Sequence, residues 1–213
     1  MAETKRKGAR SAKDIPAAIL EQLNSGKIET ANLVEWLAVN QKILLKNLLE
    51  EKGRTSYLSP VLEDIERLKK QTVNTINEAI GKGLYKQALQ VDDSQFLIEI
   101  VSHPSDLVRC WATYYIACDK NRTLSETLEL IKPFAADSHF GVREISWLSV
   151  RKLISEDISQ SIKILSEWTN SKDENVRRFT SEATRPRGVW CEHIEVLKQQ
   201  PELGLPILEP MRS

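Results

Sequence analysis

Apolar residues recur every three or four positions through most of this chain, which is the spacing of one face of an α-helix. Ile19, Leu20 and Leu23 share such a face, and the same steps continue through 33–48. Gly53 follows a charged stretch and predicts the end of a helix.

The next apolar pattern predicts a helix that opens at Ser59-Pro60 and carries apolar residues as far as Ile80. The stretch Gly81-Lys82-Gly83 is expected to break that helix, because glycine is unfavourable inside helices. The first ninety residues are therefore predicted to form three or four helices and no strand.

The second half of the chain contains an internal repeat of 34 residues. Each copy is predicted to be a first helix, a short polar turn and a second helix that opens with Val-Arg. A unit of this length cannot bury its apolar face alone and must stack on its neighbours, as in an α-solenoid. Four sets of positions keep the step over three copies: Val108-Arg109, Val142-Arg143 and Val176-Arg177; Leu97, Ile131 and Leu165; Ile100, Phe134 and Trp168; and Trp111, Ile145 and Phe179.

The copies resemble HEAT repeats rather than tetratricopeptide repeats, whose Trp, Leu-Gly, Tyr and Pro pattern is missing. An Asp lies in or near each turn, and an Arg lies early in each second helix. We interpret these residues as a structural ladder between neighbouring repeats, since features present in every repeat usually serve stacking. They are Asp106, Asp137 and Asp173, and Arg109, Arg143 and Arg177.

The composition is that of a soluble globular chain, with 213 residues of which 41% are apolar and 28% charged. Thirty Lys and Arg balance thirty Asp and Glu, which excludes a globally basic nucleic-acid binder but not a local basic patch. There is no apolar run of membrane-spanning length and no signal-peptide pattern. Three Cys and three His without a CxxC indicate neither a disulfide framework nor a metal site. We therefore expect a cytoplasmic chain that holds no metal.

Residues 1–13 form a basic, polar amino-terminal arm in which Glu3 is the only acid before Asp14. Such an arm can contact phosphates. A solvated, mobile terminus is the favoured interpretation from the sequence alone.

Positive charge is concentrated in the segment 176–191, VRRFTSEATRPRGVWC, where four arginines surround a single acid, Glu182. Arg178, Glu182 and Arg185 lie within one helical stripe by their i+4 and i+3 spacing. Arginine forks suit phosphate oxygens. The same arginines could instead pair with Glu182 on a solvated surface.

Pro186 is expected to end this helix, so that Arg187 and Trp190 follow on a loop. Charge runs are usually solvated faces. The segment alone therefore indicates nucleic-acid binding only weakly.

The preceding repeat reads HFGVREISWLSVRK, and in it Arg143, Trp147 and Arg151 share a helix face at i+4 spacing. This face is a candidate clamp on a nucleic-acid backbone with a stacking platform. Trp111 and Tyr115 repeat the i+4 spacing one copy earlier. For any single aromatic a core position is favoured. Together they suggest second helices that line a concave surface with aromatics and arginines.

The string SEATRPRGVW, with VRR before it and HFGVREISW one repeat upstream, resembles the HEAT-like-repeat DNA alkylation repair enzymes, which are alkylpurine DNA glycosylases. KGARSAKDIP and GKIETANLVEWLAVNQ are also similar to the amino-terminal part of that family, so the resemblance covers nearly the whole chain. It implies an all-α, curved solenoid whose basic concave face holds duplex DNA. It also implies hydrolysis of the glycosidic bond of N3- or N7-alkylated purines.

The resemblance assigns roles to residues. Glu182 in SEATRPR falls on the glutamate of the family's SEGTRPR string and is expected to be a catalytic carboxylate, with Glu144 as a second candidate. A carboxylate stabilises the developing oxocarbenium ion and places a water, and needs no metal or organic cofactor for this. The expected DNA contacts are Arg143, Trp147, Arg151, Arg178, Arg185, Arg187, Trp190 and Trp111.

One HEAT-like domain is expected over 14–213, with its clearest repeats in 96–191. The family's next repeat carries an Asn-Leu-Asn-Asp type motif whose aspartate contributes to the active site, and this chain is expected to end before that repeat. The expected partner is double-stranded DNA with alkylated purines, bound by a monomer. Two other functions stay open: a HEAT-like scaffold that grips DNA without chemistry, and a protein-interaction solenoid with a peptide groove.

Overall fold

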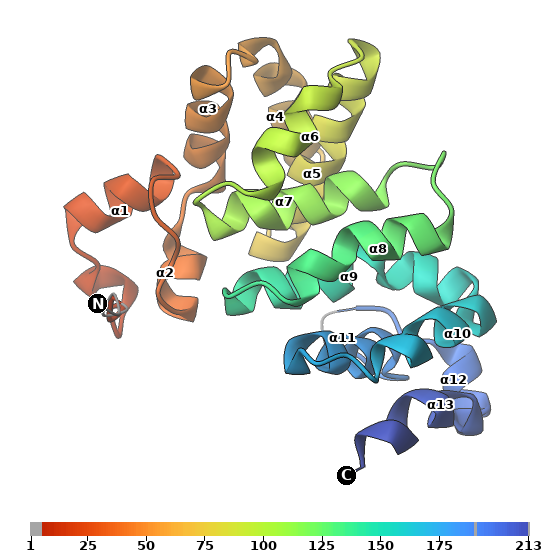
Figure 1. Ribbon diagram of the computed structural model, residues 1–213. Helices are drawn as coiled ribbons and strands as arrows, with labels where there is room; N and C mark the ends of the chain where they lie inside the picture. The colour runs from red at the N-terminus through yellow and green to blue at the C-terminus, as the bar shows by residue number, and fades with distance from the viewer. Residues whose placement is uncertain (1–5, 190, 213) are drawn as a thin grey trace. The chain divides into compact units, whose positions relative to one another are not determined.

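The computed structural model describes residues 6–189 and 191–212, and these residues form an all-α chain without a strand (Figure 1). The all-α prediction is therefore confirmed. The chain divides into two compact units, one up to Cys118 and one from Asp119 onward. Trp190, one of the predicted DNA contacts, lies outside the described residues.

The first unit consists of helices that pack mainly on their neighbours in the sequence. Asn40 caps the first turn of one of them by accepting from the amides of Lys42 and Ile43. The helices are α1 (Ala17–Asn24), α2 (Leu33–Ala38), α3 (Gln41–Glu51), α4 (Leu58–Glu66), α5 (Val73–Gln90), α6 (Ser94–Val101) and α7 (Asp106–Ala117), with short 3-10 turns at Ala12–Asp14 and Thr55–Tyr57.

The second unit continues the same architecture. Thr123 opens it with a capping box, in which its side chain and that of Glu126 bond each other's backbone amides. The helices are α8 (Leu124–Ala135), α9 (Phe140–Glu156), α10 (Ile158–Trp168), α11 (Glu174–Thr184), α12 (Glu195–Gln199) and α13 (Leu205–Leu208), with 3-10 turns at Pro201–Gly204 and Glu209–Met211.

The predicted helix end at Gly53 is confirmed, and the predicted long helix after it is wrong. Gly53 has a φ of 69°, a left-handed conformation that glycine adopts without strain. The long helix is interrupted between Glu66 and Val73, because Thr72 forms a capping box with Thr75 and starts a new helix.

The predicted break at Gly81-Lys82-Gly83 is also wrong, since α5 runs through it. A Cβ atom on Gly81 would lie 2.5 Å from the Cβ of Tyr114 and 2.6 Å from the carbonyl oxygen of Trp111. The glycine therefore serves the close approach of α5 to α7, and tertiary packing outweighs its weak helix propensity.

The three predicted repeats are the helix pairs α6–α7, α8–α9 and α10–α11. The first pair lies in the first unit and the other two lie in the second. The apolar residues of the four repeating sets are buried, except Leu97, which is half-buried. The apolar residues that repeat every 34 positions are therefore core residues.

Each second helix is fastened to its own turn by an arginine. Arg109 Nη1 donates to the carbonyl oxygens of His103 and Pro104 at 2.8 and 3.0 Å. Arg143 and Arg177 repeat this pattern, six and five residues back, at 2.7 to 3.1 Å. These bonds satisfy turn carbonyls within one repeat, where the prediction placed contacts between neighbouring repeats, and Arg109 also pairs with Glu29 at 2.9 Å.

The aspartates of the turns accept hydrogen bonds from different partners. Asp137 accepts from the amide of His139 at 2.7 Å, and Asp173 caps α11. Asp106 is buried and instead bonds Thr30, a residue far away in the sequence.

The described part of the amino-terminal arm is mostly exposed, as a solvated arm would be, but two of its residues contact α2. Arg6 donates from Nη1 and Nη2 to the two carboxylate oxygens of Glu35 at 2.6 Å each. Glu35 is buried, and the hydrogen bond from Arg6 lowers its pKa. Asn32 holds the carbonyl oxygen of Ala9 at 2.8 Å.

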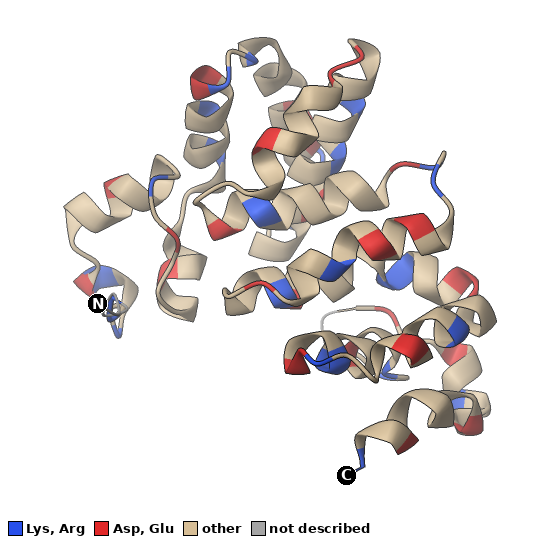
Figure 2. Ribbon diagram, viewed as in Figure 1, with Lys and Arg blue, Asp and Glu red and all other residues tan. Residues whose placement is uncertain are grey.

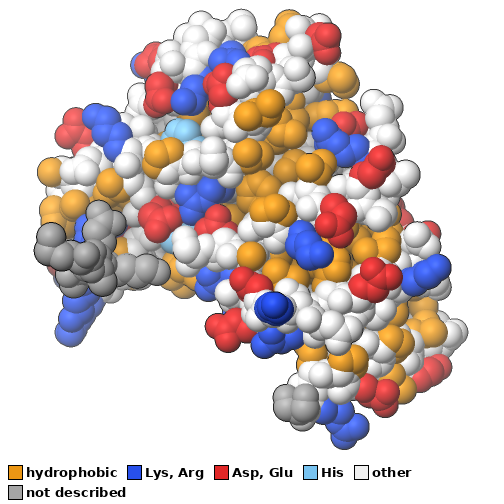
Figure 3. Space-filling view, viewed as in Figure 1, with side chains coloured by type: hydrophobic (Ala, Val, Ile, Leu, Met, Phe, Trp, Pro, Cys, Tyr) orange, Lys and Arg blue, Asp and Glu red, His pale blue; other side chains and the backbone are white. Residues whose placement is uncertain are grey.

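Charged residues of both signs are spread over the helices of each unit (Figure 2). On the face drawn in Figure 3, Lys and Arg side chains lie among Asp and Glu side chains. Charge alone therefore does not mark a site.

Candidate active site

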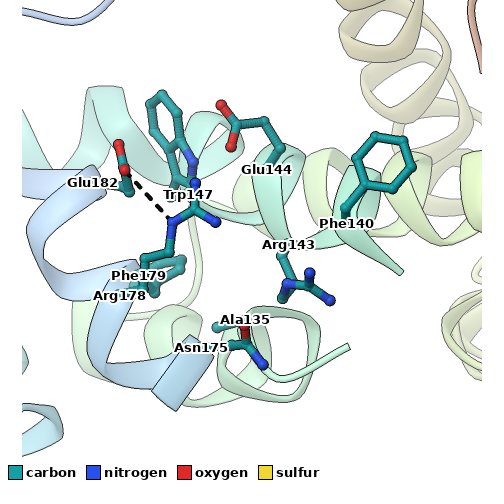
Figure 4. A pocket seen from close by; sticks show the side chains of 9 residues that line it. All are labelled: Ala135, Phe140, Arg143, Glu144, Trp147, Asn175, Arg178, Phe179 and Glu182. Carbon is teal, nitrogen blue, oxygen red and sulfur yellow. Dashed lines mark ion pairs between the residues drawn. The ribbon is translucent and has the colours of Figure 1, made fainter. Parts of the chain in front are cut away.

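A surface hollow in the second unit brings together several of the predicted site residues (Figure 4). Its volume is about 20 Å³, which holds roughly one water molecule and is far below the roughly 300–1,000 Å³ of small-molecule pockets. We call it the acidic hollow because it contains two glutamates. Its lining residues are Ala135, Phe140, Arg143, Glu144, Trp147, Asn175, Arg178, Phe179 and Glu182.

Helical spacing explains why these side chains converge. Glu144 and Trp147 are three residues apart on α9, and Arg178 and Glu182 are four residues apart on α11, so each pair shares a face. Because α9 packs against α11, the two faces border the same hollow. Figure 4 shows the two carboxylates on either side of Trp147.

Glu182 is the most firmly held acid of the hollow. Its Oε2 lies 2.7 Å from Arg185 Nη2 and its Oε1 lies 3.6 Å from Arg178 Nε. The Glu182 side chain is 15% exposed, whereas those of Arg178 and Arg185 are 61% and 49% exposed. The arginines thus reach from solvent to a carboxylate that is largely enclosed. Glu144, by contrast, is half-buried and has no paired cation among the described residues.

Trp147 is buried, with 5% of its surface exposed, so only its edge borders the hollow. Its indole Nε1 is buried and has no hydrogen-bond partner among the described residues, and the same holds for Arg143 Nε. A buried donor without a partner costs roughly 1–3 kcal/mol. The predicted open stacking platform is therefore wrong, but two unsatisfied donors belong to residues of this hollow.

Arg151, a predicted DNA contact, is placed in the interior instead. It is 4% exposed, and its guanidinium donates to the carbonyl oxygens of Ala183, Arg185 and Glu192 at 2.7 to 3.2 Å. Burial lowers its pKa. Direct phosphate contact is incompatible with this burial. Arg151 fastens the end of α11 to the loop that follows it.

Trp111, another predicted DNA contact, is a core residue of the first unit. It is fully buried, and its Nε1 donates to Gln41 Oε1 at 3.1 Å and to Asn77 Oδ1 at 3.0 Å. The core interpretation of a lone aromatic holds at this position.

Of the remaining predicted contacts, Arg143 and Arg178 line the hollow, Arg185 pairs with its Glu182, and Arg187 lines a second hollow. Arg178, Arg185 and Arg187 are exposed. Arg143 lines the hollow, while its Nη1 is engaged by the carbonyl oxygens of Asp137 and Ser138.

Two further residues of the hollows, Phe140 and Lys198, were not predicted from the sequence. Phe140 is 38% exposed, lines the acidic hollow and lies against His139 with ring centroids 4.6 Å apart. It directly precedes the Gly-Val-Arg of the repeat, which is the signal that could have found it. Lys198 lines a second hollow with Arg185 and Arg187.

The described residues contain no group of three or more His, Cys, Asp or Glu side chains placed to hold a metal ion. In the same part of the chain, no helix combines the length and the apolar character needed to cross a membrane.

Fold and site together define an all-α helical-repeat protein with a carboxylate–arginine hollow. No family model matches the chain, and no solved structure matches it. The chain is similar to the uncharacterized protein YhaZ of Bacillus subtilis strain 168, with 35% identity over 88 residues. That match covers 40% of this chain and 22% of the relative, so the matched part spans about a fifth of the relative's length.

Proposed function

We propose that this chain binds duplex DNA and hydrolyses the N-glycosidic bond of N3- or N7-alkylated purines, with Glu182 as the catalytic carboxylate. The observation that supports this most directly is that Glu182 and Glu144 share one hollow beside Trp147. The resemblance of SEATRPRGVW to the alkylpurine glycosylases supports the same reaction. In this proposal the chain acts as a monomer in the cytoplasm.

Hydrolysis of this glycosidic bond requires a carboxylate and no cofactor. An alkylated purine is already cationic, so the C1′–N bond breaks with its electron pair leaving on the base. A water then adds to C1′ and gives up one proton. Glu182 stabilises the positive charge on the sugar and accepts that proton, and Glu144 adds negative charge on the other side of Trp147.

The exposed arginines bind the phosphates of the DNA. Arg178, Arg185 and Arg187 carry planar guanidinium groups, which bind phosphate oxygens through paired donors. Each phosphate neutralised makes binding weaker in salt, with a slope of about −0.9 in log K against log salt.

One observation favours a second candidate, a DNA-gripping scaffold without chemistry. Both oxygens of Glu182 lie near arginines, at 2.7 and 3.6 Å. Carboxylate oxygens that already face arginines are less available to a water molecule. The repeat architecture and the exposed arginines would serve such a scaffold equally well.

The test is release of methylated purines from a methylated duplex, measured beside binding of the undamaged duplex over a salt series. Glu182→Gln is the test variant and Glu174→Gln, an exposed acid at the start of the same helix, is the matched control. The proposal predicts that Glu182→Gln loses release by at least about 100-fold and keeps salt-dependent binding, as expected for a lost general base. Binding without release in the unmodified chain would favour the scaffold, and weak binding that ignores salt would contradict both.

A further inference from the structure

A second hollow lies beside the acidic hollow in the second unit, between the end of α11 and α12. Its volume is about 380 Å³. We call it the basic hollow, because three of its six lining residues are cations. Its lining residues are Arg185, Pro186, Arg187, Leu197, Lys198 and Pro201.

The charge of the basic hollow is positive in balance. Lys198 Nζ pairs with both carboxylate oxygens of Glu195 at 2.8 and 2.9 Å, which offsets one cation. Arg185 pairs with Glu182, which offsets a second cation, and the exposed Arg187 has no ion pair among the described residues. Pro186, Leu197 and Pro201 give the walls apolar surface. Guanidinium groups next to apolar side chains match the chemistry of a phosphodiester, whose charged oxygens lie beside an apolar edge of the sugar.

The backbone under the basic hollow is fixed. Arg151 Nη2 donates to the carbonyl oxygen of Arg185 at 2.7 Å. The backbone amide of Ile194 donates to the carbonyl oxygen of Pro186 at 3.0 Å. An anion that enters the basic hollow therefore meets a rigid frame. What can adjust is the Arg185 side chain, which is 49% exposed.

Arg185 belongs to both hollows. Its Nη2 pairs with Glu182 Oε2 at 2.7 Å, and the same side chain lines the basic hollow. One guanidinium carries one positive charge, so an anion in the basic hollow and the Glu182 carboxylate compete for it. Without Arg185, Glu182 would keep only the 3.6 Å contact with Arg178.

We propose that the basic hollow binds a phosphodiester of the DNA backbone through Arg185, Arg187 and Lys198, and that this binding draws Arg185 away from Glu182. The inference rests on the proposed function and adds its regulation. Glu182 is held as an ion pair until DNA is in place, and engagement of the backbone frees it to act as a base. By linkage, neutralising Glu182 must strengthen backbone binding through Arg185.

The experiment is a double-mutant cycle on binding of an undamaged, labelled duplex, followed by fluorescence anisotropy at fixed salt. We expect Glu182→Gln to tighten binding three- to tenfold, and this gain to vanish in an Arg185→Gln background. Glu144→Gln is the matched control, because it removes the same charge from the acidic hollow without touching Arg185. Its smaller gain is expected to persist when Arg185 is replaced. Thermal melting checks that each variant is folded.

Two results would overturn the coupling. One is an equal gain from Glu182→Gln and Glu144→Gln, and the other is a Glu182→Gln gain that survives Arg185→Gln. A purine-release assay distinguishes failure of the coupling from failure of the proposed function. If release requires Glu182 but the effects of Glu182→Gln and Arg185→Gln on binding are additive, the coupling is overturned and the proposed function stands.

Inorganic phosphate distinguishes the source of the anion. We expect millimolar phosphate to compete with the duplex in the unmodified chain and to compete less after Lys198→Gln or Arg187→Gln. Phosphate binding that needs these residues, combined with no duplex binding, would overturn the assignment to a DNA backbone.

Discussion

The first and second units use one repeat in opposite ways. The position after the turn arginine is Cys110 in α7, Glu144 in α9 and Arg178 in α11. Cys110 is fully buried, whereas Glu144 and Arg178 line the acidic hollow. The same place in the period is therefore core in one unit and site in the other.

The difference lies in what covers the second helix. In the first unit Glu29 pairs with Arg109 at 2.9 Å, Thr30 bonds Asp106, and Gln41 and Asn77 hold Trp111. In the second unit Glu144 of α9 and Arg178 of α11 line the acidic hollow. Polar residues of a repeat become available for function only where no other segment has used them.

The two tryptophans sharpen this comparison most. We expect Trp111→Phe to lower the free energy of unfolding by roughly 3–5 kcal/mol, because it opens a cavity and leaves Gln41 and Asn77 without their donor. Trp147→Phe removes an indole N–H that has no partner and should cost about 1 kcal/mol. Urea unfolding measures both, and equal losses would break the contrast.

Arg151 tests whether the second unit depends on one buried cation. Arg151→Met leaves the carbonyls of Ala183, Arg185 and Glu192 without their donor, and we expect a loss of about 3 kcal/mol in unfolding free energy. Lys152→Met, with a side chain that is 83% exposed, is the neighbouring control and should change little. If Arg151→Met lowers the free energy of unfolding by less than Lys152→Met does, the buried position of Arg151 is contradicted.

His103 gives the first unit a pH dependence. Burial lowers its pKa to about 4, and Nδ1 of the neutral ring accepts from the amide of Ser105 at 3.1 Å. The nearby charges that act on it are Glu51, Lys52 and Arg109. The unfolded chain takes up this proton near pH 6.5, so stability is complete above that pH and falls toward pH 4, by up to about 3 kcal/mol.

Unfolding curves between pH 7 and pH 4 measure the effect, with His103→Gln as the comparison. The variant is expected to have a flatter pH profile over this window. Parallel profiles for the two proteins would contradict the assignment to His103.

The turn arginines give the smallest effects. Arg177→Met should cost about 1 kcal/mol, because two turn carbonyls lose their donor. Arg109→Met should cost about 2 kcal/mol, since the pair with Glu29 is lost as well. Thermal or urea unfolding ranks the two, and a larger loss for Arg177→Met would contradict the account of the covered helix.

The repeat was predictable from the sequence because its apolar positions keep one spacing, and those positions are core. The convergence of Glu144, Arg178 and Glu182 on one hollow follows from helical spacing once α9 and α11 are neighbours. The core position of Trp111 was the favoured interpretation of a lone aromatic, but its partners Gln41 and Asn77 were not predictable. The burial of Arg151 was not predictable either, because no local pattern links it to the loop after Pro186. From the sequence, Gly81 is expected to break a helix. The close approach of α7, which leaves no room for a Cβ atom at this position, could be found only from the structure.

The most direct test of the central claim is the rate of purine release under single-turnover conditions from a methylated duplex, for the unmodified chain and for Glu182→Gln. The account predicts release by the unmodified chain and a loss of at least about 100-fold in the variant, with duplex binding retained or tightened. An unchanged rate in Glu182→Gln would contradict it and remove Glu182 from the chemistry.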